Sequence, residues 1–343
     1  MNKTTNESFS NVGTKYDTSC IVVLVIVTCG VIGNFLTLFA LMYAKHKKKH
    51  GIHKSWKSNY VFIWNLTLVD FIGSINMLYI YIQFVFNPLA MNDQYSCVAV
   101  LTIRDVLVLV EAGAIACIAI VRMLGITKNV TWLNFCDNTS NVFLVLLITW
   151  LFGGIAYVRK FISISDVLHN PDNDDHFDCG NFFYIMNSSR FTLYSEFCAH
   201  ILVFIIIIGS YICIAVYMRK NSEISSSRHF TKNDSKTTKI IFGVCAVYIL
   251  QCVPYMIVRG FFVSSMRKGF FIQFSSEFRV CYVVYYTQFT LNMFIYPLGK
   301  SEFYKAYIDL FQQIYKCFVN MMSSENDNDS NAQSRKSSNA IDV

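Results

Sequence analysis

The chain has 343 residues, of which 54% are hydrophobic and 15% are charged, and its formal net charge is +7. This composition is too apolar for an ordinary soluble protein. The apolar residues gather in seven blocks long enough to span a bilayer as helices, at residues 19–44, 58–86, 95–123, 142–158, 191–218, 237–263 and 280–298. The sequence therefore predicts an all-α membrane protein, a seven-transmembrane helix bundle over residues 19–299.

The two ends of the first block indicate how the bundle is oriented. Residues 1–18 are polar and carry glycosylation sequons at Asn2 and Asn6. These can be glycosylated only if the N-terminus lies outside the cell. Residues 45–57 read KHKKKHGIHKSWK, and six lysines in one short loop place it in the cytoplasm. Such a basic run could bind nucleic acid in a soluble protein. Between two membrane spans it favours a topology and lipid-headgroup signal instead. We expect the N-terminus outside and the C-terminus in the cytoplasm.

The third block carries a regular stripe of polar residues. Cys97, Arg104 and Glu111 are seven residues apart, and Arg122 follows eleven later. On a helix all four fall within an arc of about 40°. Charges in a membrane helix are costly and nearly always face the interior of the protein. The alternative, a soluble core helix with a few buried charges, is disfavoured because the flanking blocks are just as apolar. We therefore expect this helix to stand in the middle of the bundle.

The remaining blocks add a few local features. The second places Asp70 at mid-membrane, and Pro254 should kink the sixth. The loop at 159–190 is acidic and holds a sequon at Asn187, which suits the outside. Residues 301–319 have apolar residues at helical spacing, which predicts a short amphipathic helix on the cytoplasmic membrane surface. Cys317 at its end is a candidate for palmitoylation, with a plain interfacial cysteine as the alternative. Residues 320–343 are expected to be a disordered cytoplasmic tail.

Taken together, the polar markers occur in order, about one per block, at Gly33-Asn34, Asn65-Leu66 with Asp70, Cys97 with Arg122, Trp150, Cys179, Tyr211, Pro254 and Asn292 to Tyr296. In these features the chain resembles the rhodopsin-like (class A) G-protein-coupled receptors, from about residue 20 to 317. The resemblance implies a plasma-membrane receptor with an extracellular ligand, a heterotrimeric G protein and arrestin as partners. An enzyme is not expected, because no metal-spaced His/Cys cluster or nucleophile motif is present.

The resemblance also implies roles for single residues. Cys97 and Cys179 would form the disulfide that ties the second outer loop to the third helix. An unpaired Cys97 or a bond to Cys198 are the alternatives. Arg122 would be the arginine of the D/E-R-Y motif, paired in the resting state with Asp234, unless Asp234 is only a solvated loop residue.

Two further groups of residues match family positions. Tyr211 and Tyr296 match tyrosines that move inward on activation. Pro254 and Asn292 are expected to belong to the same activation switch. The residues expected to form a buried polar network joining the first, second and seventh helices are Asn34, Asp70 and Asn292.

Three motifs depart from the family pattern. The D/E-R-Y motif is Val121-Arg122-Met123, and N-P-x-x-Y lacks its proline. The C-W-x-P motif reads Gln251-Cys252-Val253-Pro254 and has no tryptophan. Helix packing does not need these residues, so the fold prediction stands. A weakly coupling or constitutively active receptor, or a decoy that binds ligand without signalling, is the alternative function. A transporter is less favoured, because no internal repeat is visible.

The predicted ligand site is rich in arginine. Arg104 stands where amine receptors have an aspartate, and Tyr286 where opsins have a lysine, so neither an amine nor retinal is expected. Arg104, Arg259 and Arg279 together would suit a carboxylate or phosphate on a small molecule, lipid or peptide. The alternative is internal pairing of these arginines with the acidic loop at 172–178.

Glu111 is an unusual second acid that is expected to face Asp70. Two close buried carboxylates should not both be ionised unless they are compensated, so they should titrate as a unit. Either they share a proton or a sodium ion lies between them, with hydrogen bonds supplied by Asn34, Gln288 and Asn292. Glu111 could also turn away and pair with another helix. No other metal or cofactor is expected.

Overall fold

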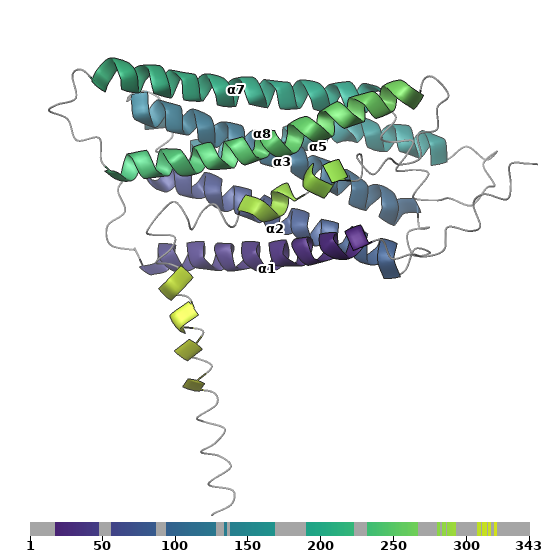
Figure 1. Cartoon of the computed structure of the whole chain (residues 1–343), viewed down its shortest axis with the longest axis horizontal. Coiled ribbons are helices and arrows are strands. Elements are labelled where there is room, and N and C mark those ends of the chain that lie inside the picture. The colour runs from purple at the N-terminus through teal and green to yellow at the C-terminus, as the bar shows by residue number, and fades with distance from the viewer. Residues whose placement is uncertain are drawn as a thin grey trace, which may run out of the picture.

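The computed structural model describes residues 18–47, 56–86, 94–127, 134–135, 138–168, 190–222, 232–266, 280–281, 283–285 and 287–292, with further helical pieces between 307 and 320. The regular structure in these ranges is helical. The six long helices are α1 (Thr18–Lys47), α2 (Trp56–Phe86), α3 (Gln94–Thr127), α5 (Thr139–Leu168), α7 (Arg190–Ser222) and α8 (Lys232–Met266). They lie side by side along one common direction (Figure 1).

Each long helix contains one of the predicted apolar blocks and continues past it at one or both ends. The helices have 30 to 35 residues, which corresponds to roughly 45–52 Å of length and exceeds the hydrocarbon core of a bilayer. Five of them are apolar and long enough to cross a membrane, and α5 holds a shorter apolar stretch at Ser140–Ile155. The predicted all-α bundle is confirmed.

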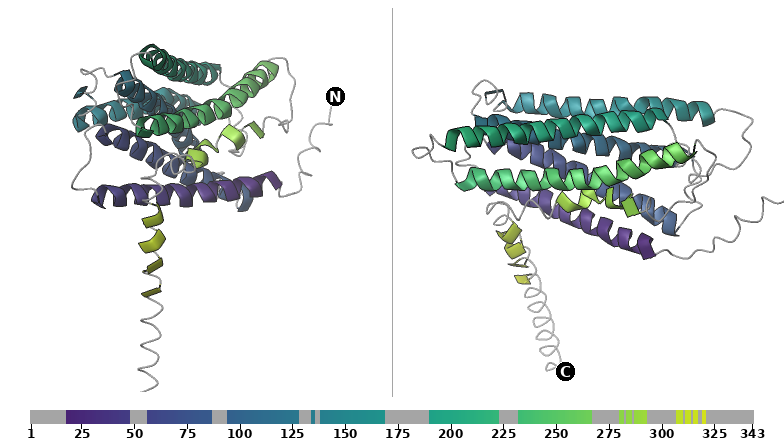
Figure 2. Two further views of the ribbon diagram at one scale, coloured as in Figure 1. Left: turned by 60° about the vertical axis from the view of Figure 1, so that its left-hand side comes forward. Right: turned by 45° about the horizontal axis from the view of Figure 1, so that its top comes forward.

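The last apolar block appears as helical turns among the described residues from 280 to 292, which we call the seventh segment. In all the views it lies between α8 and α1 (Figures 1 and 2). Two hydrogen bonds agree with this place. The Asn34 side chain of α1 donates to the carbonyl oxygen of Phe289 at 2.6 Å, and Gln251 of α8 donates to the Thr287 hydroxyl at 3.1 Å.

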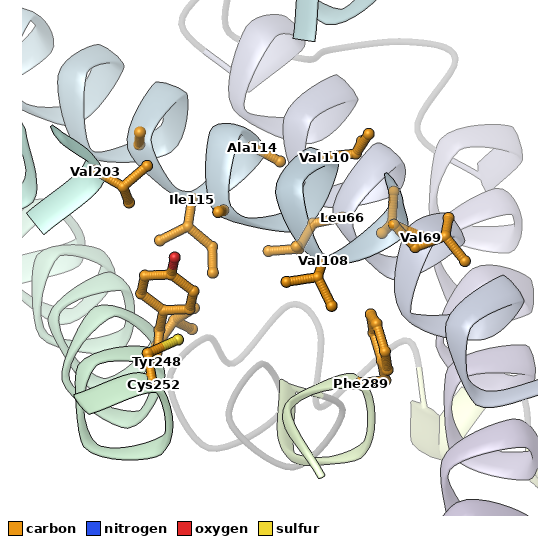
Figure 3. Packing of buried hydrophobic residues seen from close by; sticks show 14 of the residues in the cluster. Leu66, Val69, Val108, Val110, Ala114, Ile115, Val203, Tyr248, Cys252 and Phe289 are labelled. Carbon is orange, nitrogen blue, oxygen red and sulfur yellow. The ribbon is translucent and has the colours of Figure 1, made fainter. Parts of the chain in front are cut away.

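Helix α3 stands at the centre of the bundle, as its polar stripe predicts. It contacts α2, α5, α7 and α8, and its apolar span has the largest buried share of the five candidate spans. Around it lies one apolar core, in which Ile115 and Val108 face side chains of the neighbouring elements, among them Leu66, Val203, Tyr248 and Phe289 (Figure 3). The outward faces of α5 and α7 expose large apolar side chains such as Leu147, Phe152 and Ile205, which is what a lipid environment favours.

Gly73 makes a close approach between α2 and the seventh segment. A methyl group added there would lie 2.6–2.8 Å from the ring of Phe289, and the Phe289 backbone is held by Asn34. We expect Gly73→Ala to lower stability by about 1–3 kcal/mol through overpacking, measured as the thermal unfolding midpoint in lipid nanodiscs. Gly154→Ala is the matched control, because no atom lies within 4 Å of its added methyl group. Equal losses in the two variants would contradict the packing argument.

The helical pieces between 307 and 320 leave the bundle at a steep angle to α1 (Figures 1 and 2). Their near end is held by hydrogen bonds, from the Tyr307 hydroxyl to that of Thr37 and from the Gln313 amide to the Tyr43 hydroxyl. Along the same pieces, apolar side chains three or four residues apart are exposed, at Ile308, Phe311, Tyr315 and Val319. Such spacing makes one apolar face; that this face lies on the membrane surface stays a prediction.

Candidate functional site

A buried polar centre lies where α2, α3 and the seventh segment meet. The side-chain amide of Asn292 donates to Asp70 Oδ2 at 3.1 Å and to Glu111 Oε1 at 3.3 Å. All three side chains are almost completely buried. The structure thus brings Asp70 of α2 and Glu111 of α3 to one amide group, that of Asn292.

The centre is incompletely compensated. Asp70 Oδ1 and Glu111 Oε2 are buried without a hydrogen-bond partner among the described residues. Two ionised carboxylates with one shared donor would be a costly arrangement in a membrane interior. A proton or a cation between the two acids would remove that cost, so the geometry fits either of the two predicted states.

The other two amides predicted for this network have different hydrogen bonds. Asn34 donates to the Phe289 carbonyl oxygen and, at 3.5 Å, to the Ser74 hydroxyl. Gln288 accepts from the Cys252 thiol at 3.9 Å. Its own nitrogen is buried without a described partner. Asn34 therefore fastens α1 to the seventh segment, and Asn292 is the amide that holds the two acids.

Arg104 is buried and has its counter-charge beside it in the chain. Its Nε donates to Asp105 Oδ1 at 2.7 Å, and its Nη2 lies 2.6 Å from the same oxygen. Asp105 did not stand out in the sequence, because neighbouring residues of a helix point about 100° apart. The acidic partner comes from α3 itself, and the loop at 172–178 lies outside the described residues.

Arg259 of α8 is also buried in an ion pair, with Glu196 of α7. The hydroxyl of Tyr157 in α5 donates to the other oxygen of Glu196 at 2.9 Å. The Arg259 guanidinium lies over the Tyr255 ring, 5.8 Å from its centroid, while its Nε and Nη2 have no described hydrogen-bond partner. Arg279 and Tyr286 lie outside the described residues, so a cluster of three arginines stays a prediction.

A second polar group, absent from the sequence predictions, joins α7, α8 and the seventh segment. His200 has Nδ1 2.7 Å from the Tyr248 hydroxyl and Nε2 3.0 Å from the Tyr285 hydroxyl. The ring of Tyr285 stacks on that of Tyr255, with centroids 4.1 Å apart. The available signal was a pair of ionisable residues four apart, Glu196 and His200, inside an otherwise apolar span.

The residues expected to act on activation are only partly described. Arg122 is half-buried near the end of α3. Asp234 belongs to the first turn of α8 and not to a loop. The Tyr211 ring meets that of Phe242 in α8 edge to face, at 5.3 Å. Pro254 lies inside α8. Tyr296 lies outside the described residues, as do the sequons at Asn2, Asn6 and Asn187, and Cys317.

Cys97 is buried and disulfide-bonded in the structure. The alternative partner Cys198 is a free cysteine, and so is Cys281. Cys179 lies outside the described residues, so the Cys97–Cys179 pairing stays a prediction. A mass-spectrometric map of the non-reduced protein is expected to show one peptide pair that links these two residues. Alkylation of both as free thiols would contradict it.

Comparison with known proteins gives one family. The sequence model described as "7 transmembrane receptor (rhodopsin family)" matches residues 33–296. Among similar proteins is melanin-concentrating hormone receptor 1 of Sus scrofa, 24% identical over 293 residues. The receptors of the same name from Macaca mulatta and Homo sapiens are each 23% identical over 292 residues. Each match covers 81% of this chain and 76% of the relative. The predicted resemblance is confirmed: the chain belongs to the rhodopsin family of seven-transmembrane receptors, which are receptors and not enzymes.

Proposed function

We propose that this receptor binds an extracellular hormone and passes the signal to heterotrimeric G proteins from the plasma membrane, with its N-terminus outside. Relatives named as receptors for melanin-concentrating hormone support the ligand class, and the lysine-rich loop at 45–57 supports the orientation. Arrestin and membrane lipids are further partners that the family resemblance suggests.

The observation that carries this proposal is the buried polar centre of Asp70, Glu111 and Asn292. A bundle that only anchored the chain would gain nothing from two acids in its apolar middle, since each is costly there. Groups that can be compensated in two ways, by a proton or by a cation, are suited to bias an equilibrium between two helix arrangements. Such an equilibrium is what a signalling receptor needs.

The ion pairs of Arg104 and Arg259 favour a ligand that offers neutral hydrogen-bond acceptors over a ligand that offers a negative charge. Arg104 and Arg259 each have an acidic partner inside the bundle, so a ligand carboxylate would have to compete with a buried one. Arg259 still has two nitrogen atoms without described partners, which a neutral carbonyl oxygen could use while Glu196 remains in place. Amide carbonyl groups supply such acceptors, and we therefore propose a peptide ligand.

The test uses the purified receptor in lipid nanodiscs, melanin-concentrating hormone as the probe, and a panel of heterotrimeric G proteins. The hormone is expected to raise the thermal unfolding midpoint and to accelerate nucleotide exchange on one class of G protein. Arg122→Ala, shown to be folded by the same thermal scan, should keep hormone binding and lose exchange. Thermal stabilisation without exchange on any G protein would indicate a decoy, and hormone-independent ion flux in proteoliposomes would indicate a transporter. No stabilisation by the hormone would remove the hormone assignment.

The proposed resting-state ion pair between Arg122 and Asp234 gives a separate prediction. Asp234→Asn is expected to raise basal nucleotide exchange, because it removes a contact that holds α8 toward α3. An exposed pair is worth at most about 1 kcal/mol, so the rise should be no more than roughly fivefold. Asp234→Glu keeps the charge and should behave like the wild type. Unchanged basal exchange in Asp234→Asn would count against the ion pair.

A further inference from the structure

His200 is placed to hold three helices together through one side chain. It is 1% exposed, and its two ring nitrogens lie within hydrogen-bond distance of hydroxyl groups from α8 and the seventh segment. A neutral imidazole has one N–H and one acceptor nitrogen. One of the two tyrosines, Tyr248 or Tyr285, must therefore donate to the ring while the other accepts from it. Both contacts are then proper hydrogen bonds, and both hydroxyls are oriented by the same residue.

Helix α7 is bonded to α8 on both sides of Pro254. Glu196 and His200 are four residues apart and so lie on one face of α7. Because α7 and α8 run in opposite directions, Glu196 meets Arg259, five residues after Pro254, while His200 meets Tyr248, six residues before it. A proline inside a helix removes a backbone hydrogen bond and allows bending at that point. The part of α8 from Lys232 to Pro254, which we call the inner half, can pivot there only if the His200–Tyr248 contact changes.

The surroundings of this contact limit how it can change. Phe204 of α7 packs edge to face on Tyr248 at 5.8 Å and lies beside the His200 ring at 6.4 Å. Tyr285 is fixed from its other side by the stack on Tyr255. The hydroxyl groups are thus held by packing on several elements. In such close packing we expect the contact to be either formed, as in the structure, or broken, with little room for intermediate positions.

The inner half of α8 also lacks the residue that the family resemblance would place there. Cys252 stands where the C-W-x-P motif has its tryptophan, and Tyr248 precedes Cys252 by one helical turn. We propose that His200 is a positioning residue whose hydrogen bonds to Tyr248 and Tyr285 hold the inner half of α8 against α7 and the seventh segment. Signalling then requires the His200–Tyr248 bond to open. This inference rests on the proposed function, because it assigns the regulation of that receptor.

The experiment measures the position of α8 without a G protein. Spin labels on Lys236, near the beginning of α8, and on Leu144 of α5 report the distance between these helices in nanodiscs. Tyr248→Phe and His200→Phe are each expected to shift the distance distribution toward a second, longer population. The double variant should shift it no further than the larger single change, because both substitutions remove the same bond. Tyr194→Phe, at a residue of α7 that is 63% exposed, is the matched control and should leave the distribution unchanged.

A merely structural role predicts a different pattern. Each single variant leaves a buried polar atom without its partner and lowers the unfolding midpoint, while the double variant recovers part of the loss. Under that reading the distance distribution stays as in the wild type, and this result would overturn the proposal. Additive shifts in the double variant would overturn it as well, since they would show that the two residues act separately.

Basal nucleotide exchange separates this proposal from the proposed function. Tyr248→Phe is expected to raise it roughly two- to tenfold, the factor that corresponds to one hydrogen bond lost from the resting arrangement. A shifted distance distribution with no exchange on any G protein would support the role of His200 and refute G-protein signalling. Nucleotide exchange by the wild type, together with an unshifted distance distribution in both variants, would support G-protein signalling and refute the role of His200.

Discussion

Replacing Glu196 with alanine is expected to destabilise the receptor by about 3–5 kcal/mol, the cost of leaving one partner of a buried ion pair without its counter-charge. Arg259 would keep its full charge while only 2% exposed, and Tyr157 would lose the carboxylate oxygen to which its hydroxyl donates. The thermal unfolding midpoint in lipid nanodiscs measures the effect.

Two further variants separate the charge from the hydrogen bonds. Glu196→Gln keeps an acceptor for Tyr157 and removes only the charge, so its loss should be smaller than that of Glu196→Ala. The double variant Glu196→Leu with Arg259→Leu removes both charges and fills the space with apolar groups, which is often neutral or stabilising for a buried pair. It should recover most of the stability. A double variant as unstable as Glu196→Ala would show that the ion pair is not the source of the effect.

The presence of the helices and the central place of α3 could be predicted from the sequence, because they follow from the length and polarity of the apolar blocks. Apolar blocks of spanning length give the helices, and the narrow arc of Cys97, Arg104 and Glu111 places α3 at the centre. The residues at which the helices end were harder to predict. Residues such as Arg159 and Lys160 end the apolar block, yet α5 continues through them to Leu168, because leaving the hydrocarbon does not require leaving the helix.

The polar centre could be anticipated because motif spacing marks Asp70 and Asn292, and the stripe of α3 marks Glu111. The pairs Glu196–Arg259 and His200–Tyr248 could not, since their members are 63 and 48 residues apart. The spacing of residues along one helix does not indicate which buried polar residue of another helix will be its partner. The sequence left two partners open for Arg259, an anionic ligand or the acidic loop at 172–178, and the structure shows that a glutamate from α7 contacts it.

Replacing Asn292 with leucine is expected to cost about 3–6 kcal/mol, because two hydrogen bonds to carboxylate groups are worth about 1.5–3 kcal/mol each. Asp70 and Glu111 would then face each other with no donor from the seventh segment. Glu111→Gln should have the opposite sign or little effect. Its amide can donate to Asp70 Oδ1, which has no described partner now, and the like-charge contact disappears. Thermal unfolding of both variants beside the wild type measures the two changes.

The same pair of variants tests whether a proton and a sodium ion compete for the centre. In the wild type, sodium should raise the unfolding midpoint and lower basal exchange more at about pH 8 than at about pH 5, since a shared proton leaves less negative charge to hold the cation. Choline chloride at equal ionic strength corrects for screening. In Glu111→Gln one negative charge is gone, so the sodium effect should be weaker and nearly independent of pH. Equal sodium and pH responses in the wild type and Glu111→Gln would show that Glu111 has no part in a cation or proton site, because Asp70 alone would then account for them.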